Sequence, residues 1–141
     1  APWQKALTAR GIAPAHIHPL PPADTPLLHT RIEALALVDH LQRSSYRRVG
    51  VTAAPFHQLR GFMTAISVVL ESDLPVRLYS CPGSPQPLWE PASHSQGSHN
   101  EQRRDLIAKE LQRIDAYQQK GDLAPTRAIL AYLEGRDAHG R

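Results

Sequence analysis

A histidine and an arginine lie three residues apart at the start of a predicted helix. His57 and Arg60 follow a short apolar run, residues 49–53, and Pro55 ends that run. Residues three apart project from neighbouring positions of a helix, so both side chains are expected to face the same region. Arginine donates paired hydrogen bonds to phosphate or carboxylate, and a helix N-terminus carries partial positive charge. The pattern predicts an anion-binding site with His57 as a candidate acid or base. The alternative is a surface histidine beside a salt-bridging arginine.

A second polar group opens another predicted helix. Thr30 followed three residues later by Glu33 is typical of a capping box, which satisfies free backbone N–H groups. If this helix begins at the carboxyl edge of a sheet, Thr30, Arg31 and Glu33 could also face a ligand, and the two interpretations are compatible. Thr52, at the end of the apolar run, would lie at the same edge. The predicted ligand-binding residues are Thr30, Arg31, Glu33, Thr52, His57 and Arg60.

Two predicted strands flank the helix that carries His57 and Arg60. Residues 46–53 are predicted to form a strand whose apolar part is covered on both faces. Residues 76–81 alternate and are rich in strand formers. Between them, the apolar residues of 56–71 recur at three- and four-residue steps, the spacing of one helix face. This order predicts a βαβ unit with parallel strands, in which ligands usually bind at the carboxyl ends.

The rest of the chain is predicted to be helix and loop. Residues 17–20 are at best an edge strand, because His18 and Pro19 interrupt them. Residues 82–100 hold four prolines and no hydrophobic period, which predicts a long loop or a lid. Further helices are predicted over residues 2–10 and 30–44 and, as two C-terminal helices, within residues 101–134.

Composition favours a single domain with a mild attraction for small anions. The 141 residues, 41% of them hydrophobic, suit a single domain over residues 1–141. No apolar run is long enough for a membrane span, and the expected location is cytoplasmic, with envelope association as the alternative. The formal charge of +3 is spread along the chain without interleaved aromatic residues, so small anions are favoured over nucleic acid as partners. The pairs His16 with His18 and His94 with His99 have no carboxylate or cysteine at a recognised ligand interval, so no metal site is predicted.

The two polar groups resemble the motifs of the YdcF-like family of bacterial proteins, which includes the SanA and ElyC envelope proteins. That family has Asn-Thr-x-x-Glu-Ala opening one helix, then a strand ending Val-Thr-Ser, then x-x-His-x-x-Arg. The matching segments here are residues 29–34 and 51–60. His29 replaces the asparagine and Ala53 replaces the serine, whereas the threonines, glutamate, histidine and arginine are retained. The resemblance covers roughly residues 1–81.

The resemblance implies a three-layer α/β/α fold with a mostly parallel, Rossmann-like sheet and a polar cleft at the strand ends. Family members begin with two strands and a Gly-rich turn that have no counterpart here. The chain is therefore expected to be the C-terminal portion of a larger domain, with an open sheet edge that needs the missing N-terminal half or a second copy.

Together these features predict a protein that binds a small phosphate-bearing or nucleotide-like ligand at the carboxyl edge of the sheet. No reaction is defined, and no cofactor is defined beyond that nucleotide-type ligand. The alternative is a non-enzymatic interaction or envelope-associated module, which docks a partner through the basic helix 101–119 or through the exposed sheet edge.

Overall fold

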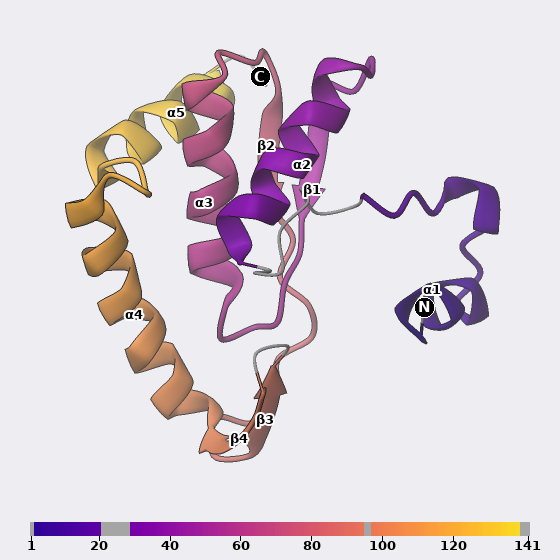
Figure 1. Cartoon of the computed structure of the whole chain (residues 1–141), viewed down its shortest axis with the longest axis vertical. Coiled ribbons are helices and arrows are strands. Elements are labelled where there is room, and N and C mark those ends of the chain that lie inside the picture. The colour runs from indigo at the N-terminus through magenta and orange to yellow at the C-terminus, as the bar shows by residue number, and fades with distance from the viewer. Residues whose placement is uncertain (1, 21–28, 95–96, 139–141) are drawn as a thin grey trace.

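The computed structural model describes residues 2–20, 29–94 and 97–138, and it is mostly helical. A long helix in the middle of the chain connects two short parallel strands, and two further helices complete the C-terminal half (Figure 1). In chain order the elements are α1 (Pro2–Ala9), the 3-10 turn η1 (Pro14–His16), α2 (Thr30–Gln42), β1 (Arg48–Val51), α3 (Gln58–Glu71), β2 (Arg77–Ser80), β3 (Pro91–His94), β4 (Gly97–Gln102), α4 (Arg103–Lys120) and α5 (Thr126–Ala138).

The predicted βαβ unit is present. Strands β1 and β2 pair in parallel, in a register that runs from Arg48 opposite Arg77 to Val51 opposite Ser80, and α3 connects them. Gln58, the first residue of α3, holds the turn after β1: its amide oxygen accepts the Ala53 N–H, and its amide nitrogen donates to the Val51 carbonyl. The first turn of α3 therefore follows directly from the carboxyl end of β1.

The predicted three-layer, Rossmann-like fold is wrong. In the described residues β1 and β2 form a two-stranded sheet, and β3 and β4 form a separate antiparallel pair. Burial alternates along β1, where Val49 and Val51 are half-buried while Arg48 and Gly50 are exposed. Packing therefore covers one face of this strand, not both. The apolar run misled the prediction because its small residues are equally compatible with a strand covered on one side.

Helix α3 is the centre of the core. It packs against α2, α4, α5 and both parallel strands, and Figure 1 shows α2 and α4 on opposite flanks of it. Ile66 and Val68 on α3 and Leu78 on β2 are completely buried. The periodicity of residues 56–71 predicted this helix to within two residues, because an amphipathic helix at the middle of a core carries a strong apolar stripe.

Helix α5 closes the outer edge of β2. The Tyr132 hydroxyl accepts a hydrogen bond from the Leu78 N–H at 2.8 Å and donates one to the Val76 carbonyl at 2.8 Å. Arg136 Nη1 donates to the Leu78 carbonyl at 2.7 Å. Side chains therefore satisfy backbone groups that a third strand would otherwise pair.

The segment predicted as a long loop contains the β3–β4 hairpin, although residues 95 and 96 within it lie outside the described part. The hairpin packs beside the start of α4, where Ala92, Leu106 and Phe56 form a small apolar cluster. Residues 17–20 form no strand. The two C-terminal helices are confirmed as α4 and α5, and the N-terminal helix as α1, which buries none of its residues and lies apart from the other helices (Figure 1).

No helix of the described residues is long and apolar enough to cross a membrane.

Replacing Tyr132 with phenylalanine should lower the free energy of unfolding by about 1–2 kcal/mol, because the Leu78 N–H and the Val76 carbonyl would lose their partner at little change in volume. Urea denaturation followed by circular dichroism measures this loss. Tyr46→Phe is the matched control, since Tyr46 is exposed and its hydroxyl makes no hydrogen bond with the part of the chain that the structure describes. Equal stability of the two variants would contradict the proposed edge closure.

Candidate functional site

A buried carboxylate on α4 organises the most polar part of the core. Glu110 is only 3% exposed, and its carboxylate meets three side chains, which come from the N-cap of α3, from α3 itself and from α4. The nearest atoms are His57 Nδ1 at 2.6 Å, Arg60 Nε at 2.7 Å and Arg113 Nη1 at 2.6 Å, and Arg60 Nη2 adds a bond at 3.2 Å. A buried charge requires such partners, because an unpaired carboxylate in the core would cost several kcal/mol.

These partners keep Glu110 ionised. Burial alone raises the pKa of Glu110, but the hydrogen bonds from His57, Arg60 and Arg113 outweigh burial and lower its pKa from 4.5 to about 2. Glu110 is therefore a fixed negative charge throughout the physiological range. An ionised carboxylate only accepts hydrogen bonds, so His57 Nδ1, which lies 2.6 Å away, must carry a proton.

This contact also sets the chemistry of the other ring nitrogen of His57. In the neutral ring, a proton on Nδ1 leaves Nε2 with a lone pair, and Nε2 lies 3.3 Å from the Thr30 hydroxyl oxygen. That hydroxyl already accepts a hydrogen bond from Arg60 Nη1 at 3.2 Å. Its own hydrogen is therefore directed to Nε2, and Thr30, His57 and Glu110 form one hydrogen-bonded chain from α2 through the start of α3 to α4.

The structure gives Arg60 two partners at once. Its guanidinium joins Glu110 on α4 to Thr30 on α2, and its carbon Cζ lies 5.5 Å from the centre of the Tyr117 ring. Arg60 is buried, and a buried guanidinium needs partners of this kind to replace the water that it has lost. The sequence predicted a ligand-binding arginine at this position, and in the structure this arginine is also the structural link among three helices.

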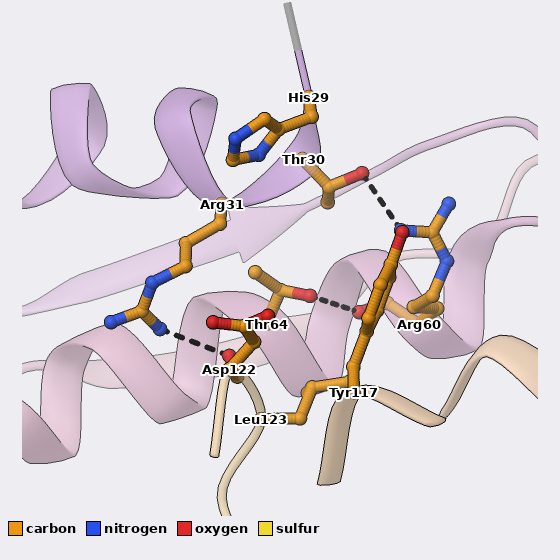
Figure 2. Close-up of a pocket in the computed structure, with 8 residues that line it drawn as sticks. All are labelled: His29, Thr30, Arg31, Arg60, Thr64, Tyr117, Asp122 and Leu123. Atoms are coloured by element: carbon orange, nitrogen blue, oxygen red, sulfur yellow. Dashed lines mark hydrogen bonds between the residues drawn. The ribbon is translucent and has the colours of Figure 1, made fainter. Parts of the chain in front are cut away.

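A pocket of about 310 Å³ opens beside this network, between α2, α3 and the C-terminal end of α4. Figure 2 shows Thr30 and Arg60 on one side of it, Tyr117 beside them, and Arg31 with Asp122 on the other. Arg31 pairs with Glu71 at 2.7 Å and donates to the Asp122 carbonyl at 2.9 Å. The complete lining is His29, Thr30, Arg31, Arg60, Thr64, Tyr117, Asp122 and Leu123.

The structure brings together four of the six predicted ligand-binding residues. Thr30, His57 and Arg60 share the network, and Arg31 lines the adjoining pocket. Glu33 and Thr52 are exposed, with no recorded side-chain partner among the described residues. The predicted capping box is wrong: His29 is the N-cap of α2 and makes no side-chain capping bond, and Thr30 is the first helical residue.

Sequence reasoning missed Glu110. The signal was its position on the buried stripe of α4, four residues after Leu106 and four before Ile114, both of which are buried. A carboxylate within an apolar stripe predicts a buried ion pair, because Glu is almost never fully buried without a partner. The described residues contain no group of three His, Cys, Asp or Glu side chains that could hold a metal ion.

Replacing Glu110 with glutamine should destabilise the fold by roughly 3 kcal/mol, because it leaves the Arg60 guanidinium buried without its counter-charge. Since folding lowers the pKa of Glu110, its contribution is fully present above about pH 4.5 and is lost as the pH falls toward 2. Urea unfolding at several pH values should show the difference between wild type and variant narrowing over that interval. The exposed Glu134 supplies the control, because Glu134→Gln should change stability little at any pH. A stability difference between wild type and Glu110→Gln that stayed constant down to pH 2 would contradict the lowered pKa of Glu110.

The description of this site comes from the geometry of this chain alone. No protein-family model, curated protein or solved structure matches the chain. The resemblance of residues 29–34 and 51–60 to YdcF-like motifs therefore stays a prediction.

Proposed function

We propose that the chain binds a small phosphate-bearing or nucleotide-like ligand in the pocket between α2, α3 and α4. The observation that carries this proposal is a buried arginine, fixed by an ion pair, at the wall of a cavity of about 310 Å³. Such a volume lies at the lower end of the range for small-molecule sites.

Arg60 retains donors for a ligand. Its guanidinium has five N–H groups, of which two serve Glu110 and one serves Thr30, so two remain. They make no recorded hydrogen bond with the described residues. Because Glu110 already holds the guanidinium in place, a phosphate or carboxylate would meet a pre-organised donor and little further side-chain entropy would be lost.

The remaining pocket walls suit a nucleotide-like ligand. The Tyr117 ring offers an aromatic surface for a planar group, and the Asp122 side chain offers carboxylate oxygens for hydroxyl or amino hydrogens. Arg31 adds a second positive charge, and the hydrogen bond from its guanidinium to Glu71 raises its pKa further. Phosphate would lie between Arg60 and Arg31, with the rest of the molecule toward Tyr117.

A second candidate function is a protein-interaction module, and the unequal edges of the parallel sheet favour it. Side chains of α5 close the edge of β2, whereas Arg48 and Gly50 on β1 are exposed, and no backbone hydrogen bond is recorded on the outer edge of that strand in the described residues. An open edge can accept a strand from a partner or from a second copy. Light scattering that gives only a monomer at all concentrations would count against self-association.

Replacing Arg31 with glutamine should weaken binding of adenosine monophosphate about tenfold, because a charge-assisted hydrogen bond to the phosphate is lost. Isothermal titration calorimetry of the folded chain measures this change. The matched control is Arg43→Gln, which removes another ion-paired arginine, at the C-cap of α2, that does not line the pocket. If both variants bind with wild-type affinity, or if wild type binds neither adenosine monophosphate nor inorganic phosphate, the proposal is wrong.

A further inference from the structure

The Thr30 hydroxyl is the point where the pocket meets the buried hydrogen-bonded chain. Thr30 lines the pocket, whereas Glu110, at the far end of the chain, is buried in the core. His57 joins them, with Nε2 3.3 Å from the hydroxyl and Nδ1 2.6 Å from the carboxylate. A hydroxyl, an imidazole and a carboxylate in this order are the parts of an activated nucleophile, its general base and the group that orients the base.

We infer that Thr30 Oγ1 is a nucleophile that accepts a phosphoryl group from a phosphate ester, with His57 as its general base and Glu110 as a positioning residue. This inference rests on the proposed function, because it takes the bound phosphate as the electrophile. It goes further by assigning a reaction to the site.

The hydrogen bonds of His57 suit removal of the proton from the Thr30 hydroxyl. Glu110 holds the proton on Nδ1, so Nε2 of the neutral ring presents its lone pair to the threonine hydrogen. Arg60 donates to the same hydroxyl oxygen at 3.2 Å, which favours negative charge on that oxygen. The two N–H groups of Arg60 that remain unused lie on the same guanidinium, where they can neutralise charge on the phosphoryl oxygens.

The charged groups around His57 come from each element packed against it. Glu110 and Arg113 lie on α4, Arg60 lies on α3, and Thr30 on α2 is polar and uncharged. One carboxylate thus faces two guanidinium groups. His57 can take up the threonine proton while Glu110 balances the imidazolium charge, which is the role of the carboxylate in hydroxyl–imidazole–carboxylate sites.

The reaction balances with water as the second substrate. Thr30 Oγ1 bonds to phosphorus as the ester P–O bond breaks, and the hydroxyl proton passes through His57 Nε2 to the departing alcohol oxygen. Water then loses a proton to Nε2 and attacks phosphorus, the bond from phosphorus to Thr30 breaks, and the proton returns to Oγ1. The sum is phosphate ester plus water giving alcohol plus inorganic phosphate.

The test uses 4-nitrophenyl phosphate and the chain of 141 residues. Wild type should release 4-nitrophenol and carry a phosphoryl group on Thr30 after rapid acid quench, as located by peptide mass spectrometry. Thr30→Val should lose about 100-fold or more of the rate, because the attacking hydroxyl is gone while His57 remains, whereas Thr30→Ser should keep measurable turnover. Thr8→Val, a change of the same size on α1, should leave the rate unchanged.

Two further measurements separate chemistry from folding and from binding. His57→Gln should abolish the phosphoryl adduct while urea unfolding shows a folded protein. If Thr30→Val or His57→Gln turns over substrate at the wild-type rate, or wild type produces no nitrophenol and no adduct, the inference fails. A wild type that binds adenosine monophosphate but transfers no phosphoryl group would overturn the nucleophile and leave the proposed binding function standing.

Discussion

The ion pair between Glu110 and Arg60 is the constraint on which the polar half of this structure depends. Both side chains are buried, and neither could be placed there alone, because an isolated charge in the core costs more than the fold can supply. Glu110 fixes two further groups, the His57 ring and the Arg113 guanidinium, and Arg60 fixes Thr30. The relative positions of α2, α3 and α4 are thereby coupled to one carboxylate.

The sequence was sufficient for the local structure around this pair, but it did not predict the pair itself. The helix of residues 56–71 and its strands at 46–53 and 76–81 were predictable, because a 3.6-residue apolar period and alternating β-formers are local signals. His57 and Arg60 were selected as neighbours for the same reason. Glu110 lies 50 residues after Arg60, and a contact over that separation leaves no local pattern apart from an acid on a buried stripe.

The architecture was mispredicted where a family resemblance replaced local evidence. A three-layer sheet needs several strands and helices on both faces, whereas in the described residues the parallel sheet has two strands, and one face of β1 is exposed. Gly50 illustrates the ambiguity. It suits a covered strand, yet in the structure Gly50 is exposed, and a Cβ built there would lie 2.9 Å from the Cys81 sulfur, which follows β2, and not against a helix. A small residue in a strand pattern therefore does not reveal whether its neighbour belongs to a helix or to the next strand.

The charge balance of the network argues for an anionic ligand more strongly than the number of arginines does. Glu110 carries one negative charge and accepts hydrogen bonds from two guanidinium groups, so the cluster keeps an excess positive charge even with His57 neutral. Arg113 is the more exposed of the two arginines, and water screens its share of that charge. Arg60 is buried at the pocket wall, where the surroundings screen its charge least. An anion in the pocket would therefore neutralise the positive charge that Glu110 leaves uncompensated. The same arrangement places the Thr30 hydroxyl between the Arg60 guanidinium and the His57 ring.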